Sequence, residues 1–214
     1  NEIWLFHSDL YHFHNNEWRK YTPLSDKEFL SCDAFYIDKN NSKWVNSERR
    51  DAEYYVDFSK GGLARFNGSN WKVFNISKSN FRGSDAGNIF KDSENNMWID
   101  SDIIMKVNDD EWTYYSPKAE WRPIRNITSI NEDFDGNIWF STYGYGLVKF
   151  DGTDWEIFNE TNSGIPNMNI FDLAFDGDGN LWYTCSNEIG VVKFDGLNFT
   201  IYDSTNFLDK RNFS

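Results

Sequence analysis

A tryptophan recurs along the chain at intervals of 40 to 54 residues, and this repetition constrains the fold more than any other feature. The series is Trp4, Trp44, Trp98, Trp139 and Trp182. A second series, of aromatic-x-x-aromatic motifs, starts at Trp18, Trp71, Trp112, Trp155 and Phe199, with spacings of 53, 41, 43 and 44 residues. Self-similarity at such a period is typical of propellers and solenoids. We therefore expect one domain over 1–214 with five repeats, at 1–31, 32–85, 86–126, 127–169 and 170–214.

The repeat at 127–169 shows how each repeat divides into strands. Four runs alternate apolar and polar residues, which is the period of a half-buried strand; they are Ile127–Ile130, Ile138–Thr142, Leu147–Phe150 and Trp155–Phe158. The Asp-Gly pairs between these runs favour tight hairpins because they tolerate positive φ. The repeat at 170–214 has the same pattern. Four antiparallel strands are the composition of a propeller blade, so we expect an all-β fold, a β-propeller of about five four-stranded antiparallel blades.

The two ends of the sequence allow two interpretations of the ring. Asn1–Trp4 begins at the turn into the second strand of its repeat, and Ser214 falls where another first strand would begin. Either this terminal strand completes the first blade and closes a five-bladed ring, or the five repeats are a fragment of a larger ring. We favour five blades, because closure removes exposed strand edges.

The longest motif of the chain resembles a known repeat. Asp135–Phe158 and Asp178–Trp182, with Gly190–Gly196, are similar to the repeat of the two-component regulator propeller family, and Asn162–Pro166 is similar to the loop that follows in that repeat. The resemblance implies an exported bacterial β-propeller, periplasmic or extracellular. It also implies one of two settings, since some members are the periplasmic sensor part of hybrid histidine kinases that respond to oligosaccharides and others stand alone.

The composition excludes several classes of partner. The net charge of -13 argues against nucleic acid, whose phosphates the protein would repel. The sequence has no run of 18 apolar residues, so we expect no membrane insertion. Cys32 and Cys185 fall at different positions of repeats far apart in the sequence, and we expect both to be buried free thiols rather than a disulfide.

Two groups of residues resemble metal ligands. His7, His12 and His14 could bind a metal ion, but the repeat alignment places His12 and His14 at exposed strand positions, which favours a solvated strand face. The turns 133–137 and 176–180 space their acidic and amide side chains like a calcium loop. Such a loop usually needs a bidentate carboxylate at its twelfth position, where this chain has Gly144 or Asn187. We therefore favour side chains that stabilise tight turns, and expect no cofactor, with calcium as the alternative.

Catalysis has little support in the sequence. The motif Asn187–Gly190 is similar to one in the propeller lyases that open cyclic peptide antibiotics. The resemblance to those enzymes implies a histidine as general acid, and no histidine follows His14. We expect no catalytic residues and no enzyme activity.

Recognition is better supported, by the loops that should gather on one face of the ring. These loops join the fourth strand of a blade to the next blade and the second strand to the third; they are Thr22–Ser31, Ser47–Lys60, Ile76–Gly87, Ser116–Asn126, Tyr143–Gly146, Glu160–Asn169 and Ser186–Ile189. Loops outside the packed strands commonly carry recognition. Arginines and aromatic residues, Tyr143 and Tyr145 among them, are concentrated here in an otherwise acidic protein.

We predict ligand contacts at Arg49, Arg50, Tyr54, Tyr55, Arg82, Trp121, Arg122 and Arg125. Arginine forks match carboxylates and sulfates, and rings offer flat apolar surfaces to sugars. The residues thus favour non-catalytic recognition of an acidic or neutral oligosaccharide. Three alternatives remain: structural ion pairs between these arginines and nearby acidic residues, a protein-interaction scaffold and, less favoured, a lyase or hydrolase.

Overall fold

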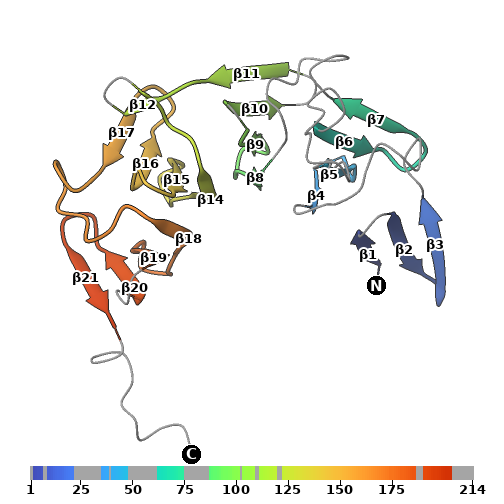
Figure 1. Cartoon of the computed structure of the whole chain (residues 1–214). Coiled ribbons are helices and arrows are strands. Elements are labelled where there is room, and N and C mark those ends of the chain that lie inside the picture. Colours follow the sequence, from blue (N-terminus) through green and yellow to red (C-terminus); the bar gives the residue numbers. More distant parts are fainter. Residues whose placement is uncertain are drawn as a thin grey trace, which may run out of the picture. The chain divides into compact units, whose positions relative to one another are not determined.

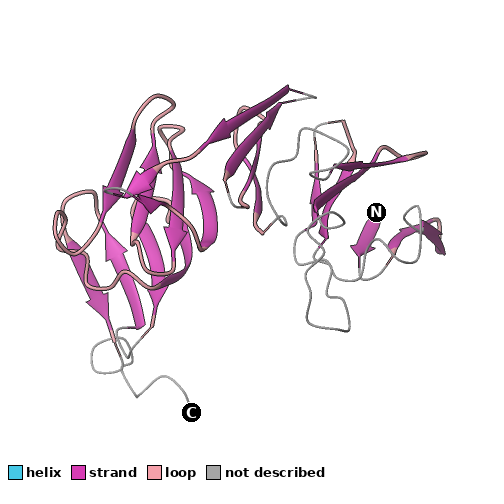
Figure 2. Ribbon diagram, turned by 45° about the horizontal axis from the view of Figure 1, so that its top comes forward, coloured by secondary structure: helices cyan, strands magenta, loops and turns pink. Residues whose placement is uncertain are grey.

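The computed structural model describes residues 2–6, 9–21, 35–38, 40–47, 62–74, 87–101, 103–108, 111–119, 122–186 and 190–203. Strands, turns and loops make up these ranges, and no helix occurs within them (Figure 2). Consequently, nothing in the described ranges is a helix long and apolar enough to cross a membrane. The chain forms two compact units, one of residues 1–91 and 95–115 and one of residues 92–94 and 116–214. The single domain over 1–214 remains a prediction.

The first unit contains three antiparallel sheets (Figure 1). The strands are β1 (Ile3–Phe6), β2 (Leu10–His14) and β3 (Glu17–Tyr21) in the first sheet, β4 (Phe35–Ile37), β5 (Lys43–Ser47), β6 (Gly62–Phe66) and β7 (Trp71–Phe74) in the second, and β8 (Ile89–Lys91), β9 (Met97–Ile99), β10 (Ile104–Asn108) and β11 (Glu111–Tyr115) in the third. Each strand pairs with its neighbours in the sequence, as in a propeller blade.

The second unit contains two four-stranded sheets and a short two-stranded ribbon (Figure 1). The ribbon pairs β12 (Lys118–Ala119) with β13 (Arg122–Pro123). The sheets are β14 (Ile127–Glu132), β15 (Ile138–Thr142), β16 (Leu147–Phe150) and β17 (Trp155–Phe158), then β18 (Ile170–Phe175), β19 (Leu181–Cys185), β20 (Gly190–Phe194) and β21 (Phe199–Tyr202). The predicted all-β fold is confirmed, and within the described residues the four repeats after the first have the expected four-stranded sheet, whereas the first has three strands. The ribbon was not predicted, because it lies within a segment assigned to a loop.

The two four-stranded sheets of the second unit pack against each other around a shared core. The core comprises Trp139, Leu147, Ile165, Ile170, Leu173, Leu181, Tyr183, Val192 and Phe194. Trp139 on β15 reaches the following sheet, where its ring meets those of Phe175 and Phe194 edge to face at 6.0 and 6.4 Å between centroids. Such aromatic pairs contribute beyond the apolar area they bury. The repeated tryptophan therefore joins one sheet to the next.

The first unit has an equivalent core between its second and third sheets. It comprises Trp44, Leu63, Phe74, Met97, Ile99, Met105 and Val107. Trp44 and Trp98 are buried, like Trp139, whereas Trp4 and Trp182 are half-buried.

The prediction of buried free thiols is confirmed only in part. Cys185 is a free thiol, as expected, but it is half-buried rather than buried, because it lies at the end of β19 beside the loop that follows. Burial raises the pKa of this thiol, which disfavours the reactive thiolate. Cys32 lies outside the described residues.

Candidate functional site

Most of the predicted ligand-binding residues lie outside the described ranges. These are Arg49, Arg50, Tyr54, Tyr55, Arg82 and Trp121. The backbone of Arg122 belongs to β13, where it pairs with Ala119. Arg125 is described and exposed, just before β14. Among the predicted recognition loops, the loop Tyr143–Gly146 of the second unit is described in full.

Backbone hydrogen bonds hold the loop Tyr143–Gly146 on both sides. The Tyr143 N–H donates to Asn126 O at 2.9 Å, next to Arg125, and the N–H groups of Gly144 and Gly146 donate to Met168 O at 2.9 and 3.2 Å. The Thr142 hydroxyl donates to Gly146 O at 2.9 Å. These hydrogen bonds pair the backbone N–H groups of Tyr143, Gly144 and Gly146, and they tie the loop to Asn126 and Met168.

A bulge at the start of β18 places an aromatic ring beside this loop. The pairing of β18 with β19 shifts register between Ile170 and Asp172, which leaves Phe171 as the extra residue. The Phe171 side chain is 50% exposed, and its ring lies 6.1 Å from that of Tyr143, which is 48% exposed. Bulges commonly redirect a side chain in this way. The equivalent residue in β14 is Thr128, which instead donates a hydrogen bond to Ile170 O at 2.8 Å.

We call Arg125, Tyr143, Tyr145 and Phe171 the aromatic platform. The first three lie in the predicted loops, whereas Phe171 belongs to β18 and was not among the predicted site residues. The available signal was two successive apolar residues, Ile170 and Phe171, which interrupt the alternation of a regular strand. Within the platform the rings of Tyr143 and Phe171 are neighbours, Tyr145 belongs to the same loop as Tyr143, and Arg125 precedes Asn126, whose carbonyl oxygen accepts the Tyr143 N–H.

The acidic turns have a structural role at the opposite end of β15. One oxygen of Asp133 accepts hydrogen bonds from the Asn137 backbone and side chain at 2.9 and 3.0 Å. The other accepts from the Asn137 side chain and from the indole N–H of Trp139, both at 2.8 Å. Asp176 holds Trp182 in the same way, at 2.7 Å, and so does Asp38 with Trp44. Surrounded by donors, these carboxylates anchor the repeated tryptophans and stabilise the turns, as expected.

This anchoring makes stability depend on pH. Burial raises the pKa of Asp133, but hydrogen bonds from Asn137 and Trp139 outweigh it and lower the pKa below its ordinary value. A carboxylate with a depressed pKa contributes stability above its unfolded pKa and loses it as the pH falls through the folded value. We expect the unfolding free energy of the wild type, measured with urea, to fall more steeply between about pH 5 and pH 2 than that of the Asp133→Asn variant. Equal slopes would contradict this role.

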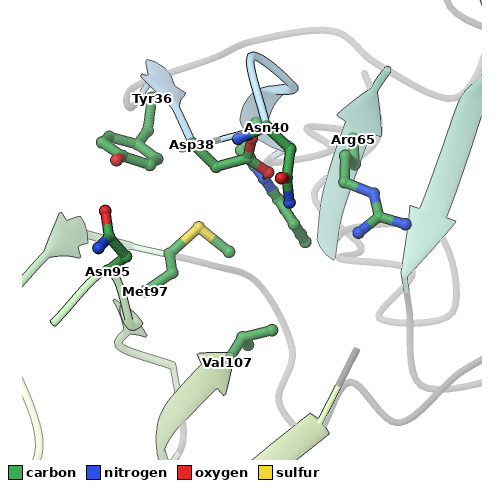
Figure 3. A pocket seen from close by; sticks show the side chains of 8 residues that line it. Tyr36, Asp38, Asn40, Arg65, Asn95, Met97 and Val107 are labelled. Carbon is green, nitrogen blue, oxygen red and sulfur yellow. Dashed lines mark hydrogen bonds between the residues drawn. The ribbon is translucent and has the colours of Figure 1, made fainter. Parts of the chain in front are cut away.

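Two equivalent cavities lie beside these anchored tryptophans. The smaller, of about 30 Å³, lies between Asp38, Trp44 and Arg65 on one side and Met97 and Val107 on the other; Figure 3 shows it with Tyr36, Asn40 and Asn95. It has room for about one water molecule. The larger, of about 350 Å³, is lined in the second unit by Asp133, Phe134, Asp135, Trp139, Lys149, Phe175, Gly179, Leu181, Phe194, Asp195 and Gly196. Its size falls within the range of ligand pockets, so it is the second candidate site.

The prediction for His12 needs a correction. His14 is half-exposed, as expected of a solvated strand face, but only 13% of the His12 side chain is exposed. Its ring stacks on that of Trp4 at 3.9 Å, nearly parallel, and this contact buries it. The side chain of His7 lies outside the described residues.

The fold and its repeated anchors can now be compared with known proteins. The family model described as two-component regulator propeller matches residues 122–144 and 164–187. These two stretches of the chain are similar to the two-component regulator propeller repeat. Each matched stretch includes the first two strands of a sheet and the Asp-anchored turn between them. The resemblance indicated by the sequence motifs is thereby confirmed.

Three solved structures have a similar fold, and this chain spans less than a third of the length of two of them. The extracellular domain of a hybrid two-component system from B. thetaiotaomicron matches with a TM-score of 0.69 and 20% identity, over 97% of this chain and 28% of that one. Virginiamycin B lyase from Staphylococcus aureus matches with a TM-score of 0.68 and 13% identity, over 94% and 66%. PorZ, a type-IX secretion surface component of Porphyromonas gingivalis, matches with a TM-score of 0.66 and 18% identity, over 90% and 30%.

At these identities the likeness shows the fold, a β-propeller, and not the activity. A comparison with curated proteins finds no match.

Proposed function

We propose that the repeats form a non-catalytic recognition module of a sensor propeller, which binds an extracellular or periplasmic oligosaccharide on its loop face. The observation that carries this proposal is the exposed ring pair of Tyr143 and Phe171, 6.1 Å apart. Two apolar rings, each about half exposed in a polar protein, give a sugar ring flat surfaces on which to lie. Arg125 is exposed and precedes Asn126, whose carbonyl oxygen accepts the Tyr143 N–H, and a guanidinium fork is the group that best matches the carboxylate of an acidic sugar.

The fixed backbone supports affinity. The loop Tyr143–Gly146 is tied to Asn126 and Met168, so ligand binding would not have to order it. In a mobile loop, the entropic cost of ordering reduces the affinity for the ligand. The platform residues themselves include neither a carboxylate nor an imidazole, the groups that most often transfer protons in hydrolysis or elimination. The platform therefore favours recognition over turnover.

The test is a thermal-shift screen of the chain against acidic and neutral oligosaccharides. A ligand that binds only the folded state stabilises it by about 2.7 kcal/mol at a hundredfold excess over its Kd. We expect one class of sugar to raise the Tm, and the double variant Tyr143→Ala, Phe171→Ala to lose that shift while keeping the Tm of the free protein within a few degrees. Both side chains are half exposed, so their removal costs little folding energy.

The matched control is Phe134→Ala, at the other end of β15. Phe134 is 72% exposed and lines the 350 Å³ cavity. If the sugar shift survives in the double variant but disappears in Phe134→Ala, the cavity is the binding site and the loop-face proposal is wrong. If no sugar shifts the Tm, oligosaccharide recognition is wrong and a protein-interaction scaffold takes its place.

A further inference from the structure

Three potential metal ligands come together on the first hairpin, which belongs to the first unit, whereas the proposed sugar site belongs to the second. They are Glu2, His12 and His14, whose donor atoms all lie within 4.8 Å of one another. His12 and His14 are two residues apart on β2, so their side chains share one face of the strand. The β1–β2 pairing matches Ile3 with Phe13, and one more step in that register places Glu2 opposite His14.

The distances fit a metal-binding triad with little rearrangement. One Glu2 oxygen lies 3.7 Å from His12 Nε2 and the other lies 3.5 Å from His14 Nδ1. In a tetrahedral zinc site with bonds near 2.1 Å, neighbouring donor atoms are about 3.4 Å apart. Glu2 and His14 are both about half exposed, so their side chains have the freedom to close the remaining gap.

His12 supplies a second, independent observation. Its Nε2 atom is buried and makes no hydrogen bond, although buried polar atoms are normally paired. The Glu2 oxygen at 3.7 Å is beyond hydrogen-bond distance. The stack on Trp4 fixes the direction of the ring.

We propose that Glu2, His12 and His14 bind a first-row transition-metal ion, with Zn²⁺ as the representative ion. Two imidazoles and one carboxylate suit zinc, copper, nickel and ferrous iron, whereas calcium and magnesium prefer oxygen ligands throughout. The positive charges of Lys43 and Arg19 act on His12, and they disfavour a metal cation at this site. Lys43 Nζ is held at 2.6 Å by Asn41 O, and the carboxylate of Glu2 supplies the opposite charge within the site.

The site is tested by calorimetric titration of the 214-residue chain with Zn²⁺, and separately with Ca²⁺. We expect saturable binding of one Zn²⁺ per chain and none of Ca²⁺ at the same site. His14→Ala and Glu2→Gln should each weaken Zn²⁺ binding by about tenfold or more. His12→Phe keeps a ring to stack on Trp4 while removing both nitrogens, so it should abolish binding without unfolding the hairpin.

The control is Glu156→Gln, an exposed carboxylate of β17 in the other unit, which should leave Zn²⁺ affinity unchanged. A Cu²⁺ titration followed by electron paramagnetic resonance should show two nitrogen ligands in the wild type and one in His14→Ala. Zinc binding that persists in both His12→Phe and His14→Ala would overturn the proposal, and so would the absence of saturable heat with the wild type.

Discussion

Gly146→Ala should be among the most destabilising single substitutions in the second unit. Gly146 has a φ of +82°, and a Cβ built there would lie 2.1 Å from the carbonyl oxygen of Phe158. Neither atom can move aside easily. The Gly146 carbonyl oxygen accepts a hydrogen bond from the Thr142 hydroxyl, and Phe158 is the last residue of β17. The left-handed conformation and the backbone clash together should cost at least about 4 kcal/mol of unfolding free energy.

Gly152→Ala separates the two causes. Gly152 also has a positive φ, of +98°, but nothing lies within 4 Å of its Cβ position. Its replacement should cost only the conformational penalty of about 1–2 kcal/mol. Urea unfolding of both variants, followed by tryptophan fluorescence, measures the difference. If the two substitutions cost the same, the close approach to Phe158 is not a structural constraint.

Asp133→Ala should have the second largest effect, because it leaves a buried indole N–H without an acceptor. Trp139 is 5% exposed and donates to Asp133 at 2.8 Å, and the side chain of Asn137 loses its partner as well. Leaving a buried donor unpaired costs about 1–3 kcal/mol, and more for hydrogen bonds to a charged group. We expect a loss of about 2–4 kcal/mol in unfolding free energy.

Asp135→Ala is the matched control in the same turn. Asp135 is exposed, and its backbone N–H, not its side chain, bonds to Asp133. Its replacement should change stability by no more than about 0.5 kcal/mol. Chemical unfolding with near-ultraviolet circular dichroism reports both stability and the environment of Trp139. Similar losses in the two variants would mean that the Asp133–Trp139 hydrogen bond does not anchor the strand.

The sheets of the second unit were predictable because their signals are local. Each strand is a short alternating run. The turns from first to second strand and from third to fourth are marked by an Asp-Gly pair whose glycine, such as Gly136 or Gly179, takes the positive φ that the turn requires. The repeat then supplies the same evidence twice. The predicted strands and the observed ones consequently agree to within a residue or two over 127–202.

The features that the sequence did not reveal depend on pairing between segments. Phe171 becomes exposed because β18 shifts register against β19, and no local motif specifies that shift. His12 is buried because Trp4 on the neighbouring strand covers it, and Glu2 joins the two histidines only once β1 and β2 pair. The acidic turns were correctly seen as turn-formers, but their tryptophan partner, six residues further on, appears only in three dimensions.

The most direct test of oligosaccharide recognition is hydrogen exchange of the chain with and without the sugar that gives the largest thermal shift. Binding at the aromatic platform should slow exchange in the loop Tyr143–Gly146 and around Phe171, and leave the turns 133–137 and 195–198 unchanged. Slower exchange confined to those two turns, or no local change at saturating sugar, would contradict a binding site on the loop face.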